Sequence, residues 1–491
     1  MTDADPPFRR AFRLNYYCNI CGHRPNGGII MAFITESPKK VPVIHEADVC
    51  VIGGSCTGVF AAVRAARLGA KVVIVECQNS FGGVATNGLV CVWHTFYDTE
   101  HKKQVISGLT EEVLERLDDI DHSIANPRNP DSDSNFFNPV ELKCELDALL
   151  REENVKIYLH TYYAGISCDG DTVDAVFVEN KDGRGAIKAK FFIDATGDGD
   201  LCRDLGIERF ENPKMQPPSY VFLMQGDDTK VCNEIDIKGS DPVTHLLNRH
   251  IDEFGIERDW GWATPIPGID NMMMRANTHV FGLHCGKADD LTEAELVGRH
   301  KMRVIRDLLR KYGDPNEKYS LVGDCSYIGV RDTYHYRTKH QIDAMELLLG
   351  NSYDDCILRG TYNVDAHDSK EGISFMRLDG TYTVEDSYGN MKEGNWRAER
   401  GLPTDNTPTF YQLPFKTLVG EKYTNFIAAG RMINADASAF GALRVMVNLN
   451  QIGEASGVAA YLAVTQNKSV QELDGAEVAR TLAKGGSANL G

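Results

Sequence analysis

The sequence predicts an α/β protein whose main unit is built on a buried parallel sheet. A short apolar strand at 49–52 precedes a glycine-rich turn and an alanine-rich helix at 59–68, and a second apolar strand occupies 71–76. A similar strand returns late in the chain, at 425–430, before a small-residue helix at 447–464. Continuous apolar runs are typical of strands covered on both faces. The α/β pattern therefore opens and closes the chain.

The other elements follow in chain order. Residues 1–45 contain many Pro and Gly and no sustained periodicity, so we expect a flexible extension there. Leucines recur at spacings of three and four at 139–153, which predicts a helix, and a strand follows at 155–159. Strands at 173–179 and 186–192 predict a hairpin or small meander.

The middle of the chain has a different character. Polar loops alternate there with isolated helices, such as the one expected near 293–311. This pattern favours an inserted α+β domain that supplies the substrate side of a site. We expect four parts: an extension (1–45), a discontinuous nucleotide-binding domain (46–210 and 410–470), a substrate or cap domain (211–409) and a C-terminal tail (471–491).

Composition excludes several classes of function. Among 491 residues, 52 Lys and Arg face 70 Asp and Glu, and a net charge of −18 disfavours nucleic acid as a partner. No apolar run is long enough to span a bilayer, and no secretory signal is evident. The 13 cysteines form no small disulfide framework, which favours reduced thiols and a cytoplasmic location. Cys18, Cys21 and His23 give only half of a zinc-site spacing, so no metal is expected.

The turn after the first strand has the form of a dinucleotide-binding fingerprint. It reads Gly53, Gly54, Ser55, Cys56, Thr57 and Gly58, with Ser55 at the second glycine of G-x-G-x-x-G. Such a turn lets a pyrophosphate approach the N-terminus of the following helix. Glu76 ends the second strand, where a carboxylate can accept both ribose hydroxyls of an adenosine. Strand, helix and acid together predict a bound dinucleotide.

A second glycine-rich segment favours FAD over NAD. It follows Glu76 and Cys77 directly and contains Gly82, Gly83, Thr86 and Asn87. This segment can lie against an extended cofactor, whereas a nicotinamide dehydrogenase has no need of it.

At this point the sequence resembles the FAD-dependent oxidoreductases of the glutathione-reductase-like superfamily, over nearly all of 46–465. The resemblance implies a glutathione-reductase-type, Rossmann-like FAD domain. It also implies cofactor contacts: Ala195, Thr196 and Gly197 near the diphosphate and ribose, Tyr163 at the adenine, Gly430 and Arg431 along the pyrophosphate and ribitol, and Arg444, Val445 and Met446 at the flavin pyrimidine. A positive group there stabilises a reduced flavin.

Catalytic candidates are His94, His367 and Arg331. Histidine suits the base that removes a proton while a hydride leaves the neighbouring C–H bond. Each histidine could instead be a hydrogen-bonded structural imidazole, and Arg331 could form an ion pair at the surface or between domains. Aromatic and basic residues near Arg331 line either a substrate site or a domain interface; they are Tyr327, Tyr334, His335, Tyr336 and Arg337.

The expected function is FAD-dependent oxidation or reduction of a small polar organic molecule by hydride transfer to or from flavin N5, most simply as a dehydrogenase. The alternatives are a flavin monooxygenase, an NAD(P)H-dependent reductase and a non-catalytic redox-sensing flavoprotein. The motif Trp-x-Trp-x-Ile-Pro of flavin halogenases is incomplete, because Thr264 replaces the isoleucine. Substrate identity, electron acceptor, covalent flavin attachment and formation of a homo-oligomer stay open.

Overall fold

The computed structural model describes residues 34–120, 124–125, 132–226, 242–368, 372–386 and 390–486. Residues 1–41 are a separate unit, and its described part, 34–41, contains no helix or strand. The zinc-like spacing at Cys18, Cys21 and His23 lies outside the described residues. The second unit, 42–491, contains every helix and strand given below.

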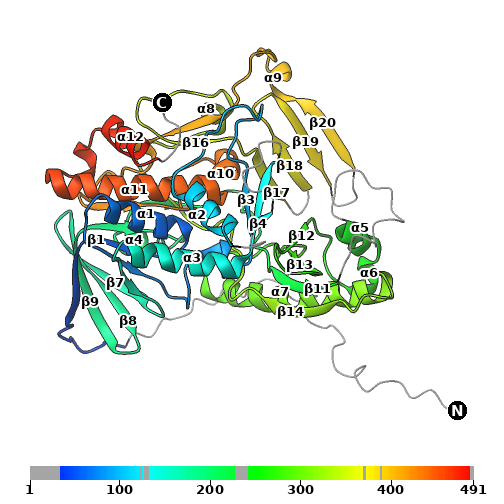
Figure 1. Ribbon diagram of the computed structural model, residues 1–491, viewed down its shortest axis with the longest axis horizontal. Coiled ribbons are helices and arrows are strands. Elements are labelled where there is room, and N and C mark those ends of the chain that lie inside the picture. The colour runs from blue at the N-terminus through cyan, green and yellow to red at the C-terminus, as the bar shows by residue number, and fades with distance from the viewer. Residues whose placement is uncertain are drawn as a thin grey trace. The chain divides into compact units, whose positions relative to one another are not determined.

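The largest sheet in the described part of the chain has seven strands (Figure 1). The order is β6-β2-β1-β9-β8-β7, and β22 pairs with β9 beyond the end of β8. Strands β6, β2, β1, β9 and β22 are parallel, and β9, β8 and β7 form an antiparallel meander. The bounds are β1 (Val43–Ile52), β2 (Val72–Val75), β6 (Lys156–Tyr158), β7 (Tyr162–Asp169), β8 (Thr172–Asn180), β9 (Gly183–Asp194) and β22 (Phe426–Ala428).

This sheet confirms the predicted parallel α/β core. Successive residues of β1 enter different cores, because Val49 and Val51 belong to one cluster and Cys50 and Ile52 to another. Side chains alternate between the two faces of a strand, so both faces of the sheet are buried. Strand β1 begins at Val43, inside the segment expected to be an extension.

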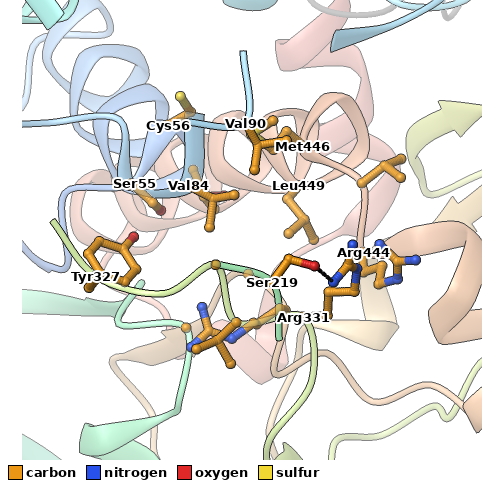
Figure 2. Close-up of a pocket in the computed structure, with 18 of the residues that line it drawn as sticks. Ser55, Cys56, Val84, Val90, Ser219, Tyr327, Arg331, Arg444, Met446 and Leu449 are labelled. Carbon is orange, nitrogen blue, oxygen red and sulfur yellow. Dashed lines mark hydrogen bonds between the residues drawn. The ribbon is translucent and has the colours of Figure 1, made fainter. Parts of the chain in front are cut away.

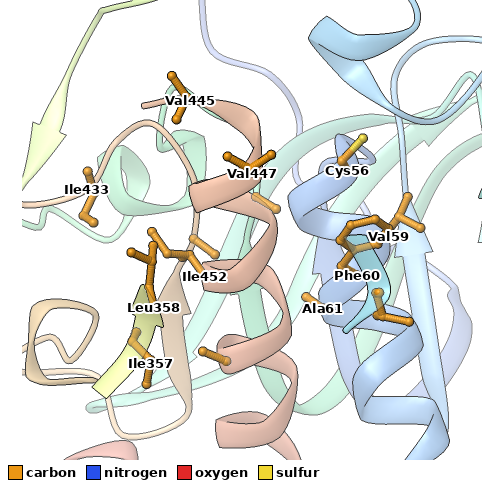
Figure 3. Close-up of a cluster of buried hydrophobic side chains, with 14 of the residues drawn as sticks. Cys56, Val59, Phe60, Ala61, Ile357, Leu358, Ile433, Val445, Val447 and Ile452 are labelled. Atoms are coloured by element: carbon orange, nitrogen blue, oxygen red, sulfur yellow. The ribbon is translucent and has the colours of Figure 1, made fainter. Parts of the chain in front are cut away.

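Helices α1 (Cys56–Arg67) and α11 (Met446–Gln466) run side by side on one face of the sheet (Figure 1). Val59 and Phe60 of α1 and Val447 and Ile452 of α11 share a core (Figure 3). The helices approach closely because Gly453 has no side chain: a Cβ there would lie 2.2 Å from the Thr57 carbonyl oxygen. The last helices of the chain therefore complete the unit begun by the first.

The middle of the chain contributes two small antiparallel sheets and one long helix. The predicted helix near 293–311 is confirmed as α7 (Ala288–Tyr312). One sheet has the order β12-β13-β11-β14 and the other β17-β18-β19-β20. The strands are β11 (Phe222–Gln225), β12 (Ala263–Pro265), β13 (Met272–Arg275), β14 (Ser320–Asp324), β17 (Val364–Asp368), β18 (Gly372–Met376), β19 (Thr381–Glu385) and β20 (Met391–Asn395).

Shorter elements connect these parts. The remaining helices are α2 (Leu109–Asp118), α3 (Pro139–Glu152), α4 (Asp200–Asp204), α5 (Pro242–Arg249), α6 (Ile251–Phe254), α8 (Ala344–Leu348), α9 (Trp396–Glu399), α10 (Ala437–Leu443) and α12 (Gly475–Lys484). The remaining strands are β3 (Val92–His94), β4 (Ile124–Ala125), β5 (Ser134–Phe137), β10 (Arg209–Phe210), β15 (His335–Tyr336), β16 (Cys356–Gly360) and β21 (Tyr411–Pro414). None of the helices in the described ranges has the length and hydropathy of a membrane-spanning segment.

Candidate functional site

A cavity of about 730 Å³ extends from the glycine turn after β1 to β17. Residues far apart in the sequence line it, including Ser55 and Val84 from the first part, Arg331 from the middle, and Arg444 and Leu449 from the last part. Figure 2 shows these side chains around one space. The cavity therefore collects the motifs that the sequence separates by hundreds of positions.

The glycine turn forms a cradle for a phosphate group at one end of the cavity. Gly53 has a φ of +104°, and a Cβ there would lie 2.2 Å from the Ala195 carbonyl oxygen, so only glycine fits. Helix α1 begins directly after Ser55, and no side chain caps its first N–H groups. Such free donors at a helix N-terminus bind anions. The cradle therefore fits the pyrophosphate of a dinucleotide.

Glu76 lies where a ribose acceptor is expected. It follows β2, its carboxylate lines the cavity, and its side chain is largely buried. One carboxylate oxygen accepts the Gly54 N–H at 2.5 Å and the other accepts the Gln78 N–H at 2.7 Å. These two bonds fix the carboxylate toward the cavity. Cys77 and Cys56 also line the cavity wall, and burial raises the pKa of each thiol to about 12.

The second glycine segment divides between the cavity wall and its support. Gly82 and Gly83 line the cavity. Thr86 and Asn87 are buried behind this wall, where Thr86 donates to the Phe81 carbonyl and Asn87 exchanges hydrogen bonds with Ser80. Gly54 and Gly58 likewise lie behind the lining residues, in close contact with Glu76 and Gly53. These four residues shape the cradle from outside the cavity.

Asp194, which the sequence analysis did not single out, holds the turn at 195–197. It is fully buried at the end of β9. Its carboxylate accepts the Thr196 N–H and hydroxyl and the N–H groups of Leu201 and Cys202 at 2.7–3.1 Å. Ala195, Thr196 and Gly197 thereby face the cavity. The signal was present in the sequence, because Asp194 directly precedes the quoted turn.

Arg431 follows β22 and lies against this turn, because a Cβ on Gly197 would be 2.5 Å from its Nη1. Its Nη2 donates to Asp198 at 2.6 Å, and its buried Nε has no hydrogen-bond partner among the described residues. Gly430 lines the cavity beside it. Tyr163 of β7 also lines the cavity, and its hydroxyl donates to Asp204 at 2.9 Å. A buried guanidinium with a free N–H suits a phosphate oxygen.

The N-terminus of α11 closes the middle of the cavity. Val445 and Met446 line it, and Arg444, just before them, donates from Nη2 to Asp365 at 2.7 Å. Asp365 also accepts the Tyr362 hydroxyl at 2.9 Å. Burial raises the pKa of the Asp365 carboxyl, but His367, Arg444 and the Tyr362 hydroxyl together hold that pKa well below its usual range. A helix N-terminus beside an arginine provides positive potential at this point.

His94 and His367 line the same cavity as Arg444. The His367 Nε2 lies 3.0 Å from Asp365, and its Nδ1 has no hydrogen-bond partner among the described residues. The His94 ring packs on Tyr362 with 4.2 Å between ring centroids. Burial lowers the pKa of each imidazole to about 4. Both are therefore neutral at pH 7 and able to accept a proton.

Arg331 lines the same part of the cavity as His94, Tyr362 and His367, and this part is called the chamber below. It comes from the segment between β14 and β15. Its Nη1 donates to the Pro217 carbonyl at 2.8 Å. The same nitrogen donates to the Ser219 hydroxyl at 2.8 Å (Figure 2). Of the aromatic and basic residues near it in sequence, Tyr327 lines the cavity, whereas His335 is buried against Asp332 and Arg337 lies at the surface beside Glu208. Of these three residues, Tyr327 alone lines the cavity.

Sequence reasoning missed a third histidine of the cavity and its carboxylate partner. His279 lines the cavity and its Nδ1 lies 2.6 Å from Asp259. Its ring centroid lies 5.0 Å from that of His367. No spacing signal marks this pair, because the two residues come from loops on opposite sides of the strand pair β12 and β13. Across the described residues, His, Cys, Asp and Glu form no metal-binding group of three or more.

The phosphate cradle, the Glu76 carboxylate and the arginines at 431 and 444 fit an extended flavin dinucleotide in one continuous cavity. The family profile described as "FAD dependent oxidoreductase" matches residues 48–482. The chain belongs to this family. FAD is accordingly its cofactor, and the Rossmann-like fold and the class of oxidoreductase predicted from the sequence are confirmed.

More distant similarities cover parts of this family member. A dihydrolipoyl dehydrogenase of Manduca sexta is 40% identical over 62 residues, 13% of this chain and 12% of that protein. A mitochondrial dihydrolipoyl dehydrogenase of Schizosaccharomyces pombe is 29% identical over 164 residues, 31% of this chain and 28% of that protein. A geranylgeranyl bacteriochlorophyll reductase-like structure from Thermoplasma acidophilum covers 90% of this chain and 83% of its own, at 11% identity and a TM-score of 0.45. The chain thus spans less than a third of either curated relative.

Proposed function

We propose that this protein is a dehydrogenase that oxidises a small polar organic molecule by hydride transfer to FAD. One observation carries the proposal: the phosphate cradle at Gly53 and a buried chamber with neutral histidines belong to the same cavity. Bound FAD supplies the two-electron acceptor. Oxidation of an alcohol also requires that a proton leave the hydroxyl, and a neutral imidazole serves that purpose.

The residues that line the chamber have separate roles. His367 has an unpartnered Nδ1, and Asp365 lies 3.0 Å from its other nitrogen, so the neutral imidazole can take the proton as the hydride leaves. Arg444 secures Asp365 and adds positive charge where the flavin pyrimidine is expected. His94 and Tyr362 pack against each other in the wall of the chamber. Arg331 faces the substrate from the other side.

We also propose the finer assignments that the sequence suggested. The FAD domain is of the glutathione-reductase type and consists of 46–210 and 410–470, and 211–409 supply the substrate side. The lining of the cavity supports this division. The middle segment contributes His279, Arg331 and His367, and the flanking segments contribute Gly53 and Arg431. A reducing cytoplasm as the location still rests on the cysteine pattern alone.

The absorbance spectrum of the purified protein tests the proposal. We expect flavin bands that bleach anaerobically when an alcohol, hydroxy acid, sugar or amine of the right class is added. Bands that resist all of these compounds but bleach with NAD(P)H would instead indicate a reductase or monooxygenase. A protein that cannot be reconstituted with FAD would contradict the cofactor assignment.

A further inference from the structure

We propose that the chamber binds a 2-hydroxycarboxylate. The guanidinium of Arg331 takes the carboxylate, and Nε2 of His279 accepts a hydrogen bond from the adjacent hydroxyl. This inference names the substrate class of the site and rests on the proposed function.

Arg331 is a cation without a carboxylate partner in the described part of the chain. Its Nη1 donates to two neutral oxygens, those of Pro217 and Ser219. The other arginine of the chamber differs, because Arg444 is paired with Asp365. A planar guanidinium with remaining donors matches the two oxygens of a carboxylate.

The surroundings of Arg331 favour an anion over a neutral ligand. Burial and the neighbouring Arg444 lower the pKa of Arg331 to about 10, so the guanidinium is charged at pH 7 but poorly solvated. Asp365 and Asp259 attract Arg331 at longer range, but neither forms an ion pair with it, because one Asp365 oxygen accepts from Arg444 and Tyr362 and Asp259 contacts His279. A sugar or simple diol would leave the Arg331 guanidinium without a directly bound anion, whereas a carboxylate would supply one.

His279 is held as a hydrogen-bond acceptor. Asp259 lies 2.6 Å from its Nδ1 and also accepts its backbone N–H at 2.8 Å. Because a carboxylate can only accept, Nδ1 carries the proton and Nε2 carries the lone pair. Nε2 is buried and has no partner among the described residues, and the imidazole lines the cavity. Lys301 donates to the His279 carbonyl and fixes the residue further.

Ser219 places the two groups beside each other. It forms β-bridges to His279 on one side and to Gly329 on the other, and Arg331 lies two residues beyond Gly329. Cross-strand partners carry their side chains on the same face, with Cβ atoms about 4.5–5.5 Å apart. The Ser219 hydroxyl, which accepts from Nη1 of Arg331 at 2.8 Å, therefore lies next to the His279 side chain. The carboxylate and the hydroxyl of the ligand should therefore be carried by neighbouring carbon atoms, which is the arrangement in a 2-hydroxycarboxylate.

Calorimetric titration of the FAD-loaded protein tests this inference without knowledge of the natural substrate. The probes are lactate, propionate, which lacks the hydroxyl, and 1,2-propanediol, which lacks the carboxylate. We expect lactate to bind at least 10-fold more tightly than either of the other two. We expect Arg331→Gln to weaken lactate binding by at least 10-fold, with partial recovery in Arg331→Lys.

His279→Asn tests the hydroxyl contact. The asparagine amide can still donate to Asp259, but the acceptor Nε2 is lost, so lactate should bind no better than propionate. Arg480→Gln is the matched control, because Arg480 lies on α12 with a side chain that is 63% exposed. It should leave all three affinities unchanged. The FAD absorbance of each variant reports whether the fold is retained. If His279→Asn no longer binds FAD, the lactate affinities of the Arg331 variants test the inference.

The outcomes separate this inference from the proposed function. Equal binding of propanediol and lactate, or unchanged lactate binding in Arg331→Gln, would overturn the carboxylate site. If neutral alcohols alone bleach the flavin, the dehydrogenase stands and the inference fails. If lactate binds through Arg331 but no compound bleaches the flavin, the site stands and the dehydrogenase fails.

Discussion

Single buried side chains set the chemistry of the chamber. His94 and His367 are neutral because burial removes the water that would stabilise an imidazolium. Arg331 keeps its charge in the same surroundings because its ordinary pKa is so much higher. The chamber thus combines neutral proton acceptors with fixed positive charge at pH 7.

His94 makes stability depend on pH. Its pKa is about 4 in the folded protein and about 6.5 when unfolded, so the unfolded chain binds the proton first as pH falls. As the pH falls from the unfolded pKa to the folded one, the free energy of unfolding decreases by about 1.4 kcal/mol per pH unit. In His94→Gln this contribution is absent. We expect the stability difference between wild type and His94→Gln to shrink by about 2 kcal/mol from pH 7 to pH 5, measured by denaturant unfolding; a constant difference would contradict a neutral His94.

Glu76 should contribute to cofactor affinity through its charge. In Glu76→Gln the side chain can still accept from Gly54, but the charged acceptor for a ribose hydroxyl is lost. Hydrogen bonds to charged groups contribute about 1.5–3 kcal/mol, so the Kd for FAD should rise roughly 10- to 100-fold. Fluorescence titration of the apoprotein measures this change. Glu179→Gln, on the exposed part of β8, is the control, and an equal effect there would refute the assignment.

At the scale of elements, the contact between α1 and α11 carries the site. The N-terminus of each helix faces the cavity, and a buried ion pair fixes the two helices to each other. Arg64 of α1 contacts Glu454 of α11, which also accepts the Leu109 N–H at 3.1 Å. Any shift of one helix along the other would change the spacing of the two helix N-termini that line the cavity.

Arg64→Met tests this contact. It leaves the Glu454 carboxylate buried without its cation, which typically costs about 3–5 kcal/mol. We expect a clear fall in Tm by differential scanning fluorimetry. Arg67→Met, one turn further along α1, breaks only partly exposed pairs with Glu112 and Glu153 and should cost less than about 1 kcal/mol. Similar losses in the two variants would argue against a special role for the buried pair.

At the scale of the whole molecule, the C-terminal segment belongs to the fold. The sequence predicts a tail at 471–491, whereas 475–484 form α12, whose Val478 and Leu482 enter the main core. Arg64 also donates to the Gly485 carbonyl at 2.9 Å. The helix was missed because it is short and follows a loop that resembles the end of a domain.

Truncation after Asn467 should therefore destabilise the protein. Burial of Val478 and Leu482 contributes about 1.5–3 kcal/mol each, and the bond to Arg64 is lost as well. We expect a fall in Tm of several degrees and weaker FAD retention on gel filtration. A truncated protein with the Tm and flavin content of the full chain would show that α12 is dispensable.

Local sequence signals predicted the first βαβ unit better than the middle of the chain. The strand, helix and acid around Gly53 and Glu76 carry distinct periodicity and turn chemistry, so α1 and β2 lie within three residues of the prediction. Strands such as β12 and β17 have only a few residues, too few for a period to show. Asp259 and His279 become partners only through tertiary contacts, which no spacing in the sequence reports.

The position of β22 has a consequence for biosynthesis. This strand pairs with β9 although more than two hundred residues separate them in the chain. A ribosome that has released everything up to β21 holds a nascent chain whose flavin cradle lacks Arg431, Arg444 and helix α11. Such a chain exposes one edge of its sheet and cannot yet retain the coenzyme. We therefore expect flavin to be captured only after α11 has been synthesised and β22 has paired with β9.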